Sequence, residues 1–264
     1  LIYDGFGWDM PSTVHLPLIL NPSGSGKLSK RDALQNNYSI FPIKWEDLDG
    51  LKEKGLLPDV QLAYISQLGS SFNSADVELD LNKMSKKFNL SALQKGGARF
   101  DFDKAKSLNQ KSLFEINSEF LMSEHPRIFK KLKLALPDRA LEIVDLIKTR
   151  VTLLNDFELE LKTFISDPLD FDESVASRIL NSVDLVDLNL LKICIQHSTN
   201  DSIKNDIYKI SMEKKLNFGK IMQFLRLSLV GNLSGPDVFF IIKMIGKNVT
   251  LRRLNSLLEK LKKQ

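Results

Sequence analysis

The sequence has little cysteine and histidine, and these shortages limit the kinds of site that it can build. Cys194 is the one cysteine among 264 residues, so no internal disulfide is possible and a reducing compartment such as the cytoplasm is expected. The histidines His15, His125 and His197 lack the spacing of metal ligands, so no structural zinc is expected. Cys194 lies in the apolar stretch LLKICIQ and is expected to fill space in a core.

Long apolar runs are also missing. No segment approaches the roughly 18 consecutive apolar residues that a membrane-spanning helix needs, so no membrane partner is expected. The first residues, LIYDGFGWDM, carry no basic region and no initiator Met, which is not the pattern of a signal peptide. The pattern already looks structured at its first residues, which indicates a fragment of a longer protein.

The composition that remains is ordinary for a globular protein, with 43% apolar and 27% charged residues. The length suits one large domain or two to three small ones. A net charge of +4 does not by itself indicate nucleic-acid binding. In residues 243–264, however, basic residues outnumber the single acid, Glu259, so this segment faces either an RNA backbone or solvent.

The spacing of apolar residues predicts a mainly helical chain beyond about residue 120. Ile143, Val144 and Ile147 recur at helical spacing, and so do Ile221 and Leu225 in a helix that should end at Gly231. The expected helix starts and caps include the following residues: Pro58, Asp80, Ser91 with Gln94 as a capping box, Asp101, Pro236 at the first helical position, and Thr250.

Two features near the N-terminus do not follow the helical pattern. Residues 15–20, His-Leu-Pro-Leu-Ile-Leu, form a short apolar run between prolines and predict a buried strand. Trp8 and Trp45 are expected in core or edge packing and not as platforms for stacked bases.

Residues 21–31 carry the chemically informative pattern, in which a glycine- and serine-rich turn leads into Lys-Leu-Ser-Lys-Arg. Glycine lets backbone N–H groups approach phosphate oxygens. Lys27, Ser29 and Lys30 add cations and a hydroxyl, which suit carboxylate attack on the α-phosphate of ATP because cations stabilise the developing charge. On these residues alone a solvated turn is the commoner explanation, and the spacing of a P-loop is absent.

This pattern resembles the Lys-Met-Ser-Lys-Ser loop of class I aminoacyl-tRNA synthetases, in the form with Leu second and Arg last that glutamyl enzymes carry. Other segments resemble the same family in the right order. They are Leu-Leu-Pro at 56–58, Leu-Gly at 68–69, Lys-Gly-Gly-Ala-Arg-Phe-Asp at 95–101, Gly-Lys at 219–220, Leu-Arg at 225–226, Gly-Pro at 235–236 and Ile-Gly-Lys at 245–247. The chain is thus similar to the C-terminal portion of a bacterial-type glutamyl-tRNA synthetase.

Some positions depart from the family pattern. Residues 38–55 form a longer segment than in many members, and Ser70 and Ser71 stand where many members have Trp. The His-x-Gly-His motif and the glutamate-binding residues are absent. This chain by itself is therefore expected to be inactive in aminoacylation.

The resemblance implies a mainly α fold, in which a helical anticodon-binding domain follows a small α/β stem-contact region and the tail end of a class I catalytic domain. The implied boundaries are 1–36 for the end of the catalytic domain, 37–122 for the stem-contact domain and 123–264 for the anticodon-binding domain, with a break near 197–205. The full-length form would activate glutamate with ATP and Mg²⁺ and transfer it to tRNA(Glu), as a monomer in the cytoplasm.

The resemblance also implies roles for individual residues. Lys30 would contact the phosphates of ATP, with Lys27 and Ser29 in support. Arginines suit the reading of unpaired bases. The candidate tRNA contacts are Arg99, Arg139, Arg150 and Arg226, with Lys220 as a phosphate contact. Each of these has a plainer alternative as a solvated or ion-paired side chain.

Two other assignments compete with this one. A glutaminyl enzyme fits less well because its C-terminal half resembles β-barrels. A non-catalytic helical interaction module without an RNA role leaves the ordered set of motifs unexplained. Whether glutamine tRNA is also charged stays open on the sequence.

Overall fold

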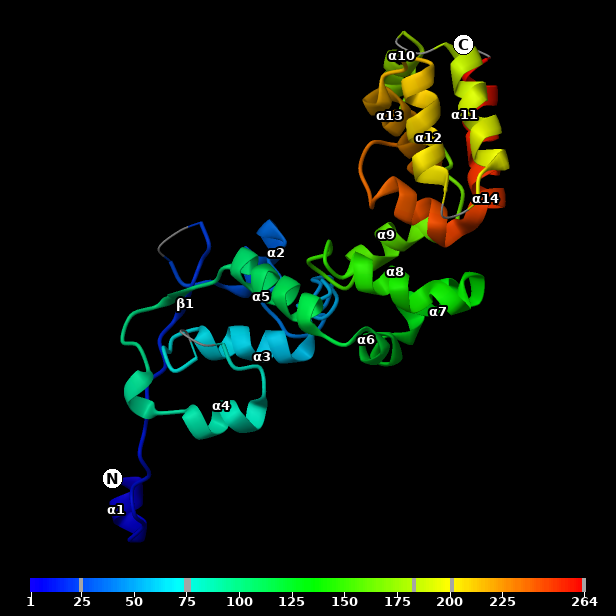
Figure 1. Cartoon of the computed structure of the whole chain (residues 1–264). Coiled ribbons are helices and arrows are strands. Elements are labelled where there is room, and N and C mark those ends of the chain that lie inside the picture. Colours follow the sequence, from blue (N-terminus) through cyan, green and yellow to red (C-terminus); the bar gives the residue numbers. More distant parts are fainter. Residues whose placement is uncertain (24–25, 74–76, 182–183, 200–201, 263–264) are drawn as a thin grey trace. The chain divides into compact units, whose positions relative to one another are not determined.

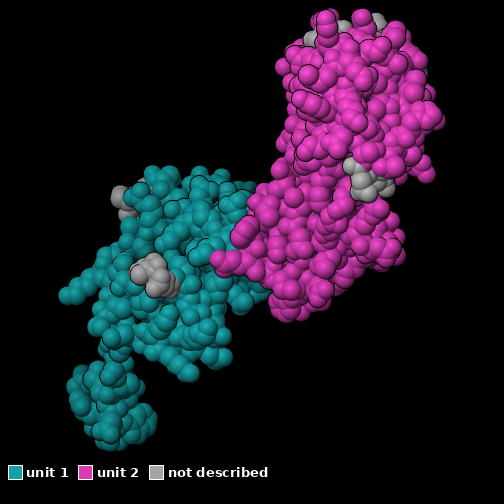
Figure 2. All heavy atoms as spheres, in the orientation of Figure 1, with its two compact units in different colours: residues 1–112, 152–154 teal, residues 113–151, 155–264 magenta. Residues whose placement is uncertain are grey.

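The fold is mainly α, as the sequence predicts (Figure 1). The computed structural model describes all residues except 24–25, 74–76, 182–183, 200–201 and 263–264. The chain divides into two compact units (Figure 2). Unit 1 contains residues 1–112 and 152–154, and unit 2 contains residues 113–151 and 155–264. The predicted three-domain boundaries stay a prediction.

Unit 1 combines short helices with one very small parallel sheet. Its elements are α1 (Ile2–Phe6), β1 (Ile19–Leu20), α2 (Lys30–Asn36), α3 (Pro58–Gln67), α4 (Leu81–Lys87), η1 (Leu90–Ala92), β2 (Ala98–Arg99) and most of α5 (Phe102–Glu115). Leu51, Leu56, Val60 and Tyr64 are almost fully buried and form part of its core. The predicted helices at 58 and 80 are confirmed, with Asp80 accepting from the backbone of Lys83.

The predicted buried strand at 15–20 is wrong in extent and in burial. Only Ile19 and Leu20 form a strand, which pairs in parallel with β2, and Leu20 also forms an antiparallel bridge with Lys27. Leu16, Leu18 and Ile19 are 72%, 55% and 41% exposed. An apolar run becomes a buried strand only when a sheet and a covering layer surround it, and the described residues of this unit supply neither for positions 15–18.

The regular secondary structure that the described residues of unit 2 form is entirely helical. The helices are α6 (Ser118–Glu124), α7 (Pro126–Ala135), η2 (Pro137–Arg139), α8 (Ala140–Ile147), α9 (Asp156–Ile165), α10 (Glu173–Leu180), α11 (Leu185–His197), α12 (Ile203–Glu213), α13 (Phe218–Val230) and α14 (Val238–Leu261). The predicted stripes on α8 and α13 face the core, with Ile143, Val144, Ile147, Ile221 and Leu225 fully buried. In Figure 1, α10 to α14 lie together as one helical bundle.

Several predicted helix ends need correction. Gly231 ends α13 in the left-handed region with φ 89°, as predicted. The following helix begins after Asp237, whose side chain caps it, because Asp accepts backbone N–H groups and Pro236 lies outside the cap. Thr250 does not start a helix; it lies inside α14, four residues after a kink at Gly246.

The predicted capping box at 91–94 is also wrong. Asn89 accepts from the backbone of Ser91 and starts the short helix η1 instead. In contrast, Asp101 caps α5 as predicted, accepting from the backbone N–H groups of Asp103 and Lys104. Among the described helices, none is long and apolar enough to cross a membrane.

Candidate functional site

The Lys-Leu-Ser-Lys-Arg segment begins within a small sheet-like arrangement of three segments in unit 1. Leu28 donates from its backbone to Ile19 at 2.8 Å, and Leu20 pairs with Lys27 in an antiparallel bridge. On the other side, Leu20 pairs in parallel with Arg99. The residues Gly24 and Ser25 of the turn lie outside the described part of the chain. Segments about 70 residues apart in sequence are thereby joined at Leu20.

Ser29 begins helix α2 through a capping box. Its Oγ donates to Asp32 Oδ2 at 2.6 Å, and the backbone of Asp32 donates back to Ser29 Oγ at 3.1 Å. The hydrogen bond from the Ser29 side chain is the main cause that lowers the pKa of Asp32 below its ordinary value. The hydroxyl of Ser29 therefore supports Lys30 by fixing the first turn of the helix that carries it.

Lys30 occupies the first position of α2, and its ammonium lies over an aromatic ring. The Nζ atom is 4.4 Å from the centroid of the Trp45 ring, and Trp45 stacks on Phe41 at 5.3 Å. A cation at a helix N-terminus is electrostatically unfavourable, and a π face offsets part of that cost. The segment 38–55 thus supplies a contact to Lys30, for which the family resemblance predicts a contact with ATP.

Of the two predicted settings for the tryptophans, core or edge packing, the structure excludes the core for both. Trp45 is 42% exposed and Trp8 is 60% exposed. Trp8 stacks on Phe6 at 4.8 Å within the N-terminal segment. Neither ring is enclosed, because aromatic partners next to each tryptophan in sequence cover only part of its surface.

Arg139 and Arg226 both donate to backbone carbonyls in unit 2, Arg139 to the first half of α14 and Arg226 to the residues just before this helix. Arg226 Nη1 donates to Pro236 O at 2.7 Å and Gly235 O at 3.0 Å, just before the helix begins. Arg139 Nη1 donates to Met244 O at 2.7 Å and to Lys243 O, just before the kink. Gly246, at φ 79° and ψ 166°, removes the partners that these carbonyls would have in a straight helix.

The other candidate RNA contacts are more loosely held. Arg150 is exposed and its Nε lies 3.4 Å from Glu160 Oε2. Lys220 is half-buried in the first turn of α13, where its backbone donates to Asn217 Oδ1 at 3.2 Å. Arg99 is exposed on β2 in unit 1. Arg139, Arg150, Lys220 and Arg226 belong to unit 2, and Lys27, Lys30 and Arg99 belong to unit 1.

Arg253 is the residue whose role the sequence did not reveal. It is 2% exposed, and its guanidinium donates to Thr163 O, Leu229 O and Ser166 O at 2.7–2.8 Å. Its Nε lies 3.0 Å from Asp167 Oδ1, which Arg252 also binds. The sequence spacing could have indicated that Arg253 is buried, because position 253 lies four residues before the buried Leu257 and on the same helix face.

The basic C-terminal segment is thus partly structural. Lys247 donates to the carbonyls of Gln196 and Ser198 at 3.0 and 3.2 Å, where α11 ends. Arg252 makes a two-bond contact with Asp167 at 2.8 and 2.9 Å. These bonds disfavour the idea that every basic residue of this segment faces an RNA backbone.

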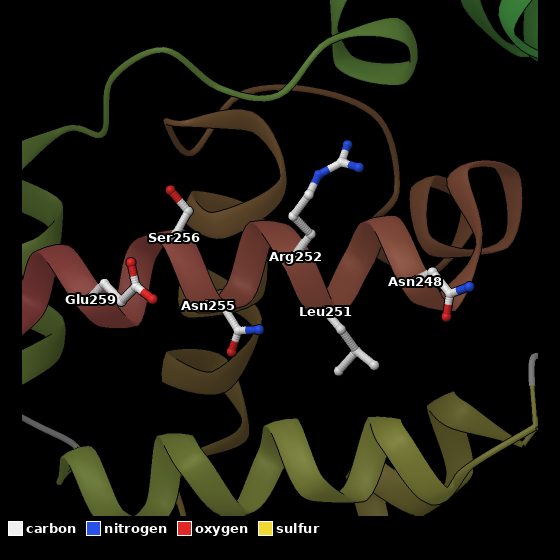
Figure 3. A pocket seen from close by; sticks show the side chains of 6 residues that line it. All are labelled: Asn248, Leu251, Arg252, Asn255, Ser256 and Glu259. Carbon is white, nitrogen blue, oxygen red and sulfur yellow. The ribbon is translucent and has the colours of Figure 1, made fainter.

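Described residues of unit 2 line at least two hollows. One, of about 500 Å³, runs along α14 (Figure 3), where Arg252 and Ser256 point to one side and Leu251 and Asn255 to the other. The second, of about 880 Å³, lies among α7, α9 and the loop after α13. Its lining includes exposed apolar side chains, two lysines and polar loop residues: Leu134, Leu159, Leu169, Lys131, Lys162, Asn232, Ser234 and Gly235.

The described residues contain no group of three or more His, Cys, Asp and Glu side chains that could hold a metal ion. Cys194 is half-buried, and burial raises the pKa of its thiol above the ordinary value. The lysine and arginine side chains described above offer positive charge and hydrogen-bond donors. Lys27, Lys30 and Arg99 in unit 1 are exposed cations that fit phosphate oxygens.

Comparison with known proteins gives consistent results. Residues 113–258 match a family described as "Anticodon binding domain". The glutamate–tRNA ligase of Christiangramia forsetii is 33% identical over 272 residues, which cover 99% of this chain and 54% of that protein. The glutamate–tRNA ligase of Flavobacterium johnsoniae is 33% identical over 262 residues, which cover 96% of this chain and 52% of that protein.

Solved structures agree over the same extent. A glutamate tRNA ligase from Elizabethkingia meningosepticum, crystallised in complex with its amino acid, superimposes with a TM-score of 0.87 at 35% identity. The match covers 98% of this chain and 54% of that one. The chain spans about half the length of the curated relatives that it matches.

Proposed function

Because the chain belongs to the anticodon-binding-domain family through residues 113–258, and is related to glutamate–tRNA ligases over about half their length, we propose that unit 2 binds tRNA at its anticodon. The whole protein, in this proposal, joins glutamate to tRNA(Glu) with ATP and Mg²⁺. It acts as a monomer in the cytoplasm, and residues 1–36, 37–122 and 123–264 are its catalytic end, stem-contact and anticodon-binding parts.

Arg226 carries the RNA part of this proposal. Its Nη1 is fixed by the carbonyls of Gly235 and Pro236, and among the described residues its Nε and Nη2 have no hydrogen-bond partner. A guanidinium held in one orientation loses little rotamer freedom when it binds a base edge. Sequence-specific RNA recognition acts mostly on unpaired bases, through stacking and edge hydrogen bonds. Arg226 is therefore our first candidate for reading a base.

The larger hollow of unit 2 supports the same assignment. Gly235, whose carbonyl binds Arg226, also lines this hollow of about 880 Å³. Exposed leucines offer apolar surface to a base face, and Lys131 and Lys162 offer charge to phosphates. Apolar surface and cations together are what a splayed single strand requires.

The remaining candidates have graded roles in this proposal. Arg139 acts mainly as a positioning residue, because it binds the carbonyls that the kink in α14 exposes. Arg150 and Lys220 are contacts for RNA phosphates. In unit 1, Lys30 contacts the phosphates of ATP, supported by Lys27 and by the Ser29 cap, and Arg99 contacts tRNA. Without the remaining half of the ligase, this chain is inactive in aminoacylation.

Binding of the chain to tRNA(Glu) transcript tests the proposal. The comparison RNAs are an unrelated tRNA and an anticodon variant, each at two salt concentrations. Loss of a base contact typically costs about 1–3 kcal/mol and relaxes specificity, so we expect Arg226→Gln to weaken binding of tRNA(Glu) and to bring it closer to the anticodon variant. Lys214→Gln, which removes an exposed charge at the end of α12, is the matched control.

Three outcomes contradict the proposal. Equal binding of all RNAs leaves unit 2 without anticodon recognition. An effect of Lys214→Gln as large as that of Arg226→Gln reduces the interaction to net charge. No binding to any RNA favours a helical interaction module instead.

A further inference from the structure

The small sheet of unit 1 places two cations on either side of Leu20. Lys27 is the antiparallel bridge partner of Leu20, and Arg99 is its parallel partner. The segment is held closely, because Ala98 donates from its backbone to Leu18 O at 3.0 Å and Phe100 donates to Leu20 O at 3.2 Å. Neighbouring strands lie about 4.8 Å apart, so the backbones of Lys27 and Arg99 are about 10 Å from one another.

The pairing also sets the face on which the side chains lie. Residues directly opposite in a sheet project from the same face, so Lys27, Leu20 and Arg99 share one face. Gly97 provides an independent check, since a Cβ there would meet the Leu20 side chain at 2.8 Å. Gly97 and Arg99 are two apart and share a face of their strand, which places Arg99 on the face of Leu20.

Both cations are exposed, and neither has an ion-pair or hydrogen-bond partner for its side chain among the described residues. The nearest acids in sequence are engaged elsewhere. Asp101 accepts from the first turn of α5, and Asp32 accepts from Ser29 in the cap of α2. Two long basic side chains on one face, with an apolar residue between them, are able to converge on a single anion.

We propose that Lys27 and Arg99 form one phosphate site, in which both side chains bind the same phosphate group. Arg offers a planar fork that matches phosphate oxygens, and Lys adds a mobile point charge. The proposal deepens the function proposed above, in which these two residues were assigned separately to ATP and to tRNA. The shared site joins the signature segment to the segment 95–101, so that one phosphate bridges both.

The phosphate belongs either to an RNA backbone or to a polyphosphate, and two binding assays distinguish the sources. The first measures affinity for tRNA(Glu) transcript between 50 and 200 mM salt for Lys27→Gln, Arg99→Gln and the double variant. The slope of log affinity against log salt falls by about 0.9 for each phosphate lost. A shared phosphate predicts a total fall of about 0.9 in the double variant, whereas separate phosphates predict about 1.8.

The second assay measures binding of inorganic tripolyphosphate to the same variants. Lys95→Gln is the matched control, because it removes an exposed cation from the same turn outside the paired strand. If the salt slope for tRNA falls by the equivalent of one phosphate and the binding of tripolyphosphate is unchanged, the site holds an RNA phosphate. Loss of tripolyphosphate binding in both single variants, with tRNA slopes unchanged, identifies a nucleotide phosphate; both results support a shared site.

The shared site is overturned by a double-variant slope change near 1.8, by effects no larger than those of Lys95→Gln, or by absence of binding to either ligand. The outcome of this test does not depend on whether unit 2 recognises the anticodon. If Arg226→Gln has no effect while the double variant changes the slope by one phosphate, anticodon recognition fails and the phosphate site stands. The reverse pattern removes the phosphate site alone.

Discussion

Replacing Arg253 with Met should strongly destabilise unit 2. The guanidinium is 2% exposed and binds three carbonyls and the carboxylate of Asp167. Met fills similar space but donates no hydrogen bond, so carbonyls at the ends of α9 and α13 lose their partners. Breaking a buried charged network typically costs about 3–5 kcal/mol, and we expect the free energy of unfolding to fall by an amount in that range. That is a large part of a typical domain stability of about 5–15 kcal/mol.

The assay is urea unfolding followed by circular dichroism at 222 nm, with Arg252→Gln as the matched control. Arg252 binds the same carboxylate, but its side chain is 62% exposed. Exposed ion pairs contribute about 0–1 kcal/mol, so the control should lose no more than that. A loss below about 1 kcal/mol for Arg253→Met, or equal losses in both variants, would refute the structural role of the buried guanidinium.

The pH dependence of stability gives a second test of the contact between Arg253 and Asp167. The hydrogen bond from Arg252, followed by the one from Arg253, lowers the pKa of Asp167 below its ordinary value. A carboxyl with a depressed folded-state pKa contributes stability above its unfolded pKa, and that contribution is lost as the pH falls through the folded value. The difference between wild type and Arg253→Met should therefore narrow as the pH falls below about 4.

Four further predictions concern the single residues Tyr64, Gly246 and Cys194. Burial raises the pKa of Tyr64 to about 12. The neutral phenol therefore contributes its full stability below about pH 10, and this contribution is lost as the pH rises through about 12. Absorbance of the tyrosinate measures the titration. Tyr64→Phe should cost about 1–2 kcal/mol in urea unfolding, because Asp101 N–H loses its 2.7 Å acceptor. Gly246→Ala should cost about 1–3 kcal/mol at φ 79° and ψ 166°, and an unchanged midpoint would contradict this. Cys194 should react with an alkylating agent at pH 8 more slowly in the native protein than in urea, since burial raises its thiol pKa.

The resemblance to glutamyl-tRNA synthetases is confirmed by the family match and by relatives that cover nearly the whole chain. Motif order carried that inference, since each short segment is weak by itself. The assignment of Lys27, Ser29 and Lys30 to ATP, and of the arginines to tRNA, stays a prediction. The capping box at Ser29 adds a physical reason for a serine between the two lysines.

Local patterns were reliable where one residue type acts on its own helix. Asp80, Asp101 and Gly231 end or begin helices as their chemistry predicts. The prediction for Thr250 was wrong because a β-branched polar residue also fits inside a helix, where its hydroxyl binds the carbonyl of Gly246. The choice between these two uses depends on whether the helix continues, which neighbouring packing decides.

The helical class and the buried stripes follow from helical periodicity, which is a local property of the chain, and the family was indicated by the resemblance of several motifs in order. The role of each basic residue depends on tertiary contacts. Arg253 is buried, Arg139 and Arg226 bind backbone carbonyls, and Arg99 lies beside Leu20 opposite Lys27. An arginine carries the same charge in each of these positions. Its hydrogen-bond partners come from segments that are distant in sequence and that packing brings into contact.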